Sequence, residues 1–316
     1  MVIKPMESTA VSVGKAFGIP GAEKVPFPAV KQGHDYEEFV PAVKKHIFDK
    51  SLGDFQAWLH CLNEPLMIQG PTGCGKSSMV SQIAARTNRP LFRLNVHNRT
   101  EMYDFVGQMV LENGSTRFKY GPLALAMKIG AWILVDEIDL AQPGILAGLN
   151  TVLEGGALCI PENGAEVIKP APGFRFIATC NTKGDGGAST NGAFGGAFRQ
   201  NAAFMDRFMV LEADYAPAKA EIAALESTGI NNEFATKMVK VASSVRNAYI
   251  QDDCSVTFST RTLLRWAQLI PAYQNKPEPT FYALERALLM RVPDQESRDL
   301  VRETMITEGL VMEDVA

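Results

Sequence analysis

The eight residues GPTGCGKS, from Gly70 to Ser77, match the pattern G-x-x-x-x-G-K-S/T in full. The apolar run PLMIQ precedes them and a segment with helical periodicity follows, which places the loop between a buried strand and a helix. Glycines in such a loop let successive backbone N–H groups surround phosphate oxygens. The sequence therefore predicts a phosphate-binding loop formed by Gly70, Pro71, Thr72, Gly73, Cys74, Gly75, Lys76, Ser77 and Ser78.

Two side chains of this loop predict what it binds. Lys76 is expected to reach the β and γ phosphates of ATP, and the Ser77 hydroxyl is expected to ligate Mg²⁺. Cys74 occupies a variable position of the pattern and is expected only to pack. A glycine-rich turn with no ligand is the alternative, and the strands that follow decide between the two.

The apolar strand WILVDE, from Trp132 to Glu137, ends in two carboxylates. Open α/β sheets bind ligands at the carboxyl ends of their strands, so these acids are expected beside the phosphate loop. Asp136 is predicted to hold Mg²⁺ through water, and Glu137 to orient and deprotonate the attacking water. Taken alone, the pair could equally be two solvated acids in a turn.

The strand GFRFIATC is followed by Asn181. If this strand lies between the two strands named above, Asn181 can hydrogen-bond the γ-phosphate or the lytic water. Asparagine is also a common turn former, which is the alternative for this residue. Its place after a third buried strand favours a role in the site.

Arg207 lies in the cluster NAAFMDRF, after a segment in which residues 181–198 contain six glycines. ATP hydrolysis needs a cation near the γ-phosphate as charge shifts in the transition state, and a neighbouring subunit can supply it. Arg207 is predicted to be that cation, and the glycine-rich run is predicted to let the segment rearrange against the neighbour. For Arg199 a solvated loop arginine is favoured over a second arginine acting in trans.

The order of apolar runs predicts the fold class. Buried strands PLMIQG, LFRLNV, AWILVD and GFRFIATC alternate with helices near residues 76–87, 123–129 and 145–154. This alternation indicates an α/β fold with a parallel sheet that helices cover on both faces. Two hairpins centred on Asn113-Gly114 and Asn163-Gly164 interrupt it, because Asn-Gly favours tight turns.

Three regions are expected along the chain. Residues 1–35 are predicted to form an extended arm, residues 36–212 the nucleotide-binding core, and residues 213–316 an α-helical lid. The core is expected to begin with helices between residues 36 and 60, where apolar residues recur every three to five positions.

Composition excludes several function classes. Apolar residues make up 46% and charged residues 21% of the 316 residues, as in soluble globular proteins. No apolar run reaches the roughly 18 to 20 residues of a membrane span, and the N-terminal segment lacks the apolar region of a secretory signal. Five cysteines without CxxC spacing argue against a zinc site or a disulfide framework. A net charge of −4 and a pI near 5.7 argue against nucleic acid as a partner. We expect a cytoplasmic protein with no membrane partner.

With these elements, the chain resembles the MoxR group of AAA+ ATPases. The residues that carry the likeness are GPTGCGKS (70–77), WILVDEID (132–139), TCN (179–181), NAAFMDRF (201–208) and STRTLL (259–264). Within the group it is most similar to the ATPase subunits of aerobic cobaltochelatases. That likeness extends to AFGI and KVPFPA near the N-terminus, to HNRTEMYDFVGQ, and to the spacing from NTKGDGG to FMDRF.

The resemblance implies an αβα sandwich around a five-stranded parallel sheet, followed by a helical lid. It also implies a Mg²⁺-dependent ATPase that forms a homo-oligomeric ring, taken to be a hexamer, and remodels a partner protein. In this group the partner often carries a von Willebrand A domain, and chelatases add a large metal-inserting subunit. The two Asn-Gly hairpins correspond to insertions that face the central pore. Arg261 corresponds to the second sensor arginine, which contacts the nucleotide of its own subunit.

Three alternatives to a general remodelling ATPase remain open. A cobaltochelatase subunit would drive metal insertion into a corrin ring only together with the subunit that holds the ring. A nucleic-acid motor of a mobile element rests on the hairpin cations Arg117, Lys119 and Lys169, which are few for an acidic chain. A nucleotide switch without hydrolysis is disfavoured, because the roles of Glu137 and Arg207 both serve hydrolysis.

Overall fold

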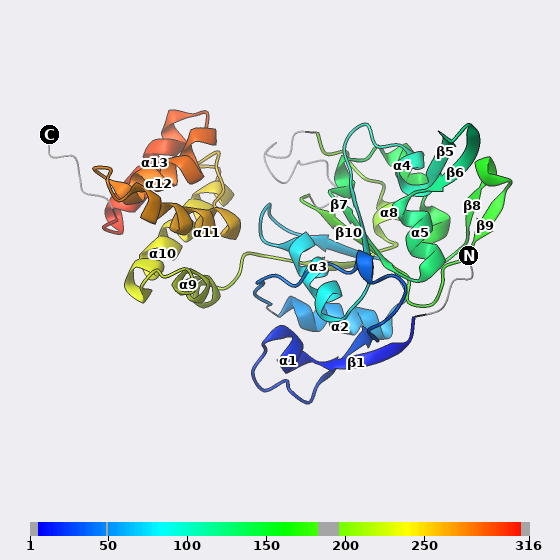
Figure 1. Cartoon of the computed structure of the whole chain (residues 1–316). Helices are drawn as coiled ribbons and strands as arrows, with labels where there is room; N and C mark the ends of the chain where they lie inside the picture. The colour runs from blue at the N-terminus through cyan, green and yellow to red at the C-terminus, as the bar shows by residue number, and fades with distance from the viewer. Residues whose placement is uncertain (1–5, 49, 183–195, 311–316) are drawn as a thin grey trace. The chain divides into compact units, whose positions relative to one another are not determined.

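The computed structural model describes residues 6–48, 50–182 and 196–310, which divide into two compact units (Figure 1). The first unit contains the described residues up to Gly70 together with Lys76–Ala213. The second contains Pro71–Gly75 and the described residues from Asp214 onward. The middle of the phosphate loop, Pro71–Gly75, therefore belongs to the same compact unit as the C-terminal helices. Residues 183–195, most of the glycine-rich run before Arg207, lie outside the described residues.

The first unit is built on the predicted five-stranded parallel sheet, which is confirmed. The strand order is β11-β3-β10-β7-β4, and every neighbouring pair is parallel. The strands are β3 (Leu66–Gln69), β4 (Leu91–Asn95), β7 (Trp132–Asp136), β10 (Arg175–Cys180) and β11 (Met209–Glu212). Since β10 pairs with both β3 and β7, Asn181 follows the strand that lies between the other two.

Both faces of this sheet are covered, which explains why its strands read as continuous apolar runs. Along β7, Ile133 and Val135 pack into one buried cluster, while Trp132 and Leu134 pack into another. The first cluster is shared with α5 (Pro122–Ile129), α6 (Pro143–Ala147), α7 (Asn150–Leu153), α4 (Met102–Val106) and α8 (Ala202–Met205). The second is shared with α2 (Ser51–Cys61) and α3 (Lys76–Arg86). Alternate side chains along β7 therefore pack into two different apolar cores, one on each face of the sheet.

The N-terminal segment differs from the extended arm that the sequence predicted. It forms β1 (Ser8–Ser12), α1 (Val13–Phe17) and β2 (Pro26–Val30), with β1 and β2 antiparallel. Phe17 and Phe27 are buried and join the cluster of α2 and α3. Elements this short have too few residues for a periodic pattern, and Pro26 and Pro28 are tolerated because the two-stranded sheet has only edge strands.

The helix predicted from residue 36 begins much later. A short 3₁₀ helix, η1, spans Glu37–Phe39, and α2 starts only at Ser51. Pro41 explains the difference, because a proline disfavours helical geometry in the preceding residue. Val40 is indeed extended, with φ −78° and ψ 124°. Likewise the helix predicted over residues 145–154 is two short helices, α6 and α7, separated around Gly148.

The two predicted hairpins take different turns. Between β5 (Gly107–Glu112) and β6 (Ser115–Tyr120), Asn113 and Gly114 have φ of 51° and 76°, as in a tight two-residue turn. The second hairpin, β8 (Leu158–Ile160) and β9 (Glu166–Ile168), instead has a five-residue connection that starts with the 3₁₀ helix η3 (Pro161–Asn163). The prediction of a tight turn at Asn163-Gly164 was therefore wrong. The 3₁₀ helix η3 begins at Pro161 and includes Asn163, so the connection is longer than a two-residue turn.

A polar cluster joins the two hairpins. Glu166 on β9 accepts hydrogen bonds from the Tyr120 hydroxyl at 2.6 Å, from Lys128 Nζ at 2.7 Å and from Asn163 Nδ2 at 2.6 Å. Lys128 Nζ also lies 4.0 Å from the centroid of the Tyr120 ring. One carboxylate thus ties the end of β6, the helix α5 and the connection of the second hairpin together.

The second unit is helical, as the sequence predicted for residues after 213. Its helices are α9 (Ala218–Glu226), α10 (Asn232–Ile250), α11 (Thr260–Leu269), α12 (Pro279–Ala287) and α13 (Gln295–Thr307), with the 3₁₀ helices η5 (Ile270–Tyr273) and η6 (Leu289–Arg291). Asn231, Ser259 and Asp294 cap three of the helices through their side chains. Trp266 and Phe258 are fully buried in the core between the helices. None of the helices in the described part of the chain is long and apolar enough to cross a membrane.

Candidate active site

Lys76 is the first residue of α3 and is buried, although its side chain carries a charge. Its Nζ donates hydrogen bonds to the Gly70 carbonyl at 2.6 Å and to Asn181 Oδ1 at 2.7 Å. Gly70 adopts φ +157°, and a Cβ there would lie 2.1 Å from the Ala213 carbonyl oxygen, so only glycine fits. The fold therefore brings the loop lysine and the asparagine after β10 to one point.

Asp136 accepts hydrogen bonds on both carboxylate oxygens. Ser77 Oγ and Thr179 Oγ1 donate to its Oδ1, the latter at 3.0 Å, and Arg93 Nε on β4 pairs with its Oδ2. Asp136 is only 4% exposed, so these donors offset the cost of burying its charge. The serine hydroxyl and the carboxylate are oxygen donors of the kind that Mg²⁺ prefers, and the pair therefore fits this ion.

Glu137 has an unusual backbone conformation. Its φ of 58° and ψ of 45° lie in the left-handed region, which costs a non-glycine residue about 1–3 kcal/mol. A hydrogen bond from its N–H to Thr179 Oγ1, 3.1 Å long, helps to hold this geometry. The side chain is exposed, and its carboxylate has no hydrogen-bond partner among the described residues. It is therefore accessible to water beside the carboxyl end of β7.

Asp139 is a residue of the candidate site that sequence reasoning missed. It lies in the 3₁₀ helix η2 (Ile138–Leu140), and its Oδ2 accepts hydrogen bonds from the N–H groups of Asn181 and Thr182 at 3.1 and 3.2 Å. The Thr182 hydroxyl donates to the same oxygen at 2.9 Å. Asp139 thus fixes the backbone from which the Asn181 side chain reaches Lys76. The third acid of WILVDEID was the available signal.

Arg207 is not brought to the phosphate loop of its own chain. It follows α8, and its guanidinium contacts Glu154 Oε1 through Nε at 2.8 Å and through a second nitrogen at 2.6 Å. β11 pairs in parallel with β3, with Met209 opposite Leu66 and Glu212 opposite Gln69. Arg207 precedes β11 while Gly70 follows β3. The backbones of these two residues are therefore separated along the strand direction by the length of a four-residue strand, about 13 Å.

Arg261 lies in the first turn of α11 in the second unit. It is exposed and forms no hydrogen bond or ion pair with any residue that the structure describes. The middle of the phosphate loop lies near the start of this helix: a Cβ on Gly73 would be 2.4 Å from Cβ of the capping residue Ser259. Gly73 also has φ +77°, so glycine is required twice over at this position.

Comparison with known proteins matches both units. Residues 65–208 match the family "AAA domain (dynein-related subfamily)", and residues 219–306 match "CbbQ/NirQ/NorQ C-terminal". The aerobic cobaltochelatase subunit CobS of a Sinorhizobium species is 33% identical over 280 residues, which cover 84% of this chain and 82% of that protein. The chain belongs to the MoxR group of AAA+ ATPases. Protein NorQ of Paracoccus denitrificans is 30% identical over 73% of this chain and 80% of its own length.

As a member of this group, the chain is a nucleotide-binding ATPase. Among solved structures, NtrX from Brucella abortus in complex with ADP superimposes with a TM-score of 0.50 at 15% identity, covering 84% of this chain and 62% of that one. At this identity the match concerns the fold alone.

Cys180 lies between two residues of the candidate site but is itself buried. Burial raises the pKa of its thiol to about 12, so the sulfur stays protonated at neutral pH. Its position between Thr179 and Asn181 is structural: the side chain packs into the core cluster beneath the sheet while its neighbours take part in the polar contacts.

Proposed function

We propose that this ATPase hydrolyses ATP with Mg²⁺ in a homo-oligomeric ring, a hexamer, and uses the reaction to remodel a partner protein. The observation that carries the proposal is the hydrogen bond between Ser77 and Asp136 beside Glu137, whose carboxylate faces no described partner. Hydrolysis needs a metal-binding pair next to a base that can reach water, and these three residues supply both.

Each residue has a role that follows from its contacts. The backbone N–H groups of the loop and Lys76 would bind the β and γ phosphates. Ser77 and, through water, Asp136 would hold Mg²⁺, which when bound neutralises charge on the phosphates. Glu137 would take a proton from the attacking water, and Asn181, held in place by Asp139, would orient that water or the γ-phosphate.

The ring is proposed because Arg207, the arginine predicted to stabilise the transition state, pairs with Glu154 and lies away from the phosphate loop of its own subunit. Arg207 lies at the amino end of β11, and the phosphate loop follows the carboxyl end of the neighbouring β3. An arginine at the opposite end of the sheet from its own phosphate loop can complete the site of a neighbour, where it would stabilise the charge on the γ-phosphate. Arg261 would contact the nucleotide of its own subunit.

The partner is proposed from the group and its relatives. A protein with a von Willebrand A domain is our first candidate. A second is a chelatase large subunit, because a relative that matches 84% of this chain is itself named as a cobaltochelatase subunit. The genes beside the coding sequence discriminate between the two candidates. A neighbouring gene for a protein with a von Willebrand A domain favours the first, and a neighbouring gene for a metal-inserting subunit favours the second.

Two measurements on the purified full chain test the proposal. Phosphate release from ATP should require Mg²⁺ and stop with EDTA, and mass photometry should find a six-subunit species in the presence of ATP. A chain that stays monomeric at every nucleotide concentration and releases no phosphate would contradict it. Candidate partners are then compared by the stimulation of phosphate release that each produces.

A further inference from the structure

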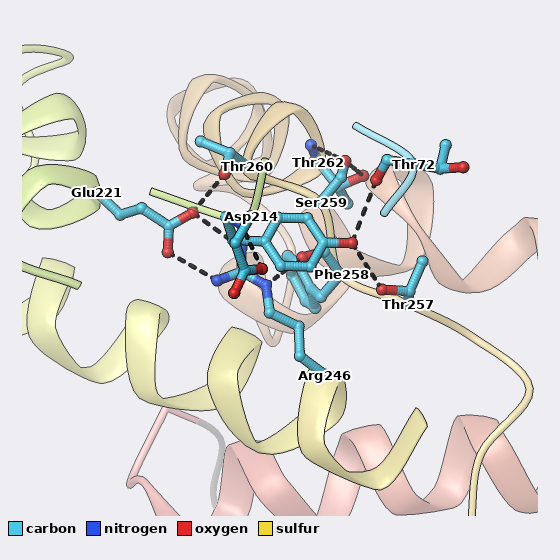
Figure 2. A network of polar contacts seen from close by, with 10 residues as sticks. Thr72, Asp214, Glu221, Arg246, Thr257, Phe258, Ser259, Thr260 and Thr262 are labelled. Carbon is cyan, nitrogen blue, oxygen red and sulfur yellow. Dashed lines mark hydrogen bonds and ion pairs between the residues drawn. The ribbon is translucent and has the colours of Figure 1, made fainter. Parts of the chain in front are cut away.

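A buried ion pair joins two helices of the second unit. Arg246 on α10 forms a bidentate pair with Glu221 on α9, with N–O distances of 2.9 and 2.8 Å (Figure 2). Glu221 is 1% exposed and Arg246 is 8% exposed. Arg246 Nε also donates to the Phe258 carbonyl at 2.6 Å, and Thr260 Oγ1 donates to Glu221 at 2.5 Å. The ion pair therefore fixes the backbone segment around Phe258 that leads into α11.

The same guanidinium supports an aromatic ring. The central carbon of the Arg246 guanidinium lies 4.0 Å from the ring centroid of Tyr215, within the range of a cation–π contact. Tyr215 belongs to the segment between β11 and α9, and its side chain is half-buried. Burial raises the pKa of its hydroxyl, so the group is protonated and can donate a hydrogen bond at neutral pH.

The Tyr215 hydroxyl contacts two segments that are far apart in the chain. It donates to the carbonyl oxygen of Thr72 in the phosphate loop at 3.2 Å, and it lies 3.0 Å from Thr257 Oγ1. Thr257 precedes the Phe258 carbonyl that Arg246 holds (Figure 2). The segment from Thr257 leads directly to Ser259, which packs against Gly73, and to Arg261.

We propose that Tyr215 is a positioning residue. Its hydroxyl holds the Thr72 backbone of the phosphate loop next to the segment that leads into α11, and the ion pair of Arg246 with Glu221 holds the Tyr215 ring in place. The inference rests on the proposed function, because it concerns the same nucleotide site. The loop binds phosphate through backbone N–H groups, so its affinity depends on the backbone being ordered before the nucleotide arrives. A hydrogen bond to the Thr72 carbonyl orders the loop without occupying any N–H group.

The test compares Tyr215→Phe with Tyr249→Phe in the full chain. Tyr215→Phe keeps the ring over Arg246 and removes only the hydroxyl. Tyr249 on α10 is a matched control, because its hydroxyl forms no hydrogen bond with a described residue. The dissociation constant of a fluorescent ATP analogue with Mg²⁺ is measured for each variant, together with KM, kcat and the melting temperature.

We expect Tyr215→Phe to weaken nucleotide binding and raise KM by about 2- to 12-fold, the range that one neutral hydrogen bond allows. kcat should stay close to that of the unsubstituted chain, because ground state and transition state lose the same contact. Tyr249→Phe should leave all values unchanged. Thr257→Val, which removes the second partner of the hydroxyl, should add little to Tyr215→Phe in the double variant.

The outcomes separate the two proposals. If the unsubstituted chain binds the analogue and Tyr215→Phe binds it equally well while its melting temperature falls, Tyr215 only stabilises the helical unit and the inference is wrong. If the unsubstituted chain binds no nucleotide, the proposed function itself fails. A fall in kcat alone would also overturn the inference, since it would place Tyr215 in the chemical step rather than in the ordering of the loop.

Discussion

Lys76 and Asn181 stand 105 residues apart in the chain and are joined by a hydrogen bond of 2.7 Å from Nζ to Oδ1. The bond links the residue that begins α3 to the residue that follows β10. Both side chains thus face the place where the strand order β3-β10-β7 brings the loop and the acids together. The first prediction concerns this lysine.

Lys76→Ala should weaken ATP binding by about 10- to 150-fold, because charge-assisted hydrogen bonds contribute about 1.5–3 kcal/mol. Equilibrium titration with a fluorescent ATP analogue measures the effect. Lys128→Ala is a suitable control, since that lysine is tied to Glu166 between the hairpins. An unchanged affinity in Lys76→Ala would mean that these glycines form a turn and not a phosphate site.

Glu137→Gln should keep ATP binding and reduce turnover by about 10²- to 10⁴-fold, the contribution of a general base. The glutamine has nearly the same shape, and Ser77 and Asp136 are untouched, so the metal site should stay intact. Phosphate release and analogue binding are measured on the same preparation. Normal turnover in this variant would exclude Glu137 as the base.

Arg207→Ala should reduce turnover by roughly 10³- to 10⁵-fold if the arginine acts in trans. Mixed with Glu137→Gln under conditions of subunit exchange, it should recover part of the activity, because an intact pocket of one variant can face an intact arginine of the other. Recovery should depend on the mixing ratio and should vanish when rings are locked by crosslinking. Arg199→Ala, an exposed arginine without an ion pair among the described residues, should behave like the unsubstituted chain.

Two results would count against this assignment. Freely exchanging mixtures that show no activity above the sum of their parts would indicate either action in cis or a need for every site in the ring. A crosslink between position 207 and position 76 of one polypeptide would decide for action in cis, and the oligomeric mechanism would then fail.

Glu166 should stabilise the hairpins in a pH-dependent manner. Its hydrogen bonds, with that from Lys128 the largest contributor and that from Tyr120 next, lower the pKa of the carboxyl below its ordinary value of 4.5. A lowered pKa in the folded state contributes stability above the unfolded value and loses it as the pH falls. The difference in free energy of unfolding between the unsubstituted chain and Glu166→Gln should therefore be full at pH 7 and shrink as the pH falls below about 4.5.

Urea denaturation between pH 7 and about pH 3, which extends below the unfolded pKa, measures that difference. Glu112→Gln is the matched control, because Glu112 pairs with Arg117 on the surface of the first hairpin, and such exposed pairs contribute little. A difference for Glu166→Gln that is the same at every pH would show that its carboxylate charge has no part in joining the hairpins.

The sequence predicted the buried strands of the sheet, which are continuous apolar runs, and the polar site residues that directly follow them. The run from Trp132 to Val135 is typical of a strand buried on both faces, and the two acids after it were therefore expected at the ligand-binding edge of the sheet. The N-terminal β1–α1–β2 unit could not be predicted, because Phe17 and Phe27 become core residues only through contact with α2 and α3. Arg93 was missed for a related reason: its pairing with Asp136 depends on β4 lying next to β7.

The backbone of Glu137 has a consequence for the stability of the molecule. A glutamate in the left-handed region is disfavoured wherever it is not required, so the folded state is less stable than it would be with glycine or asparagine at this position. Glu137→Gly should therefore abolish turnover and leave the melting temperature equal or higher, whereas most substitutions lower it. The proposed role of Glu137 as the general base thus implies a trade-off between activity and stability, which calorimetry can detect without any substrate.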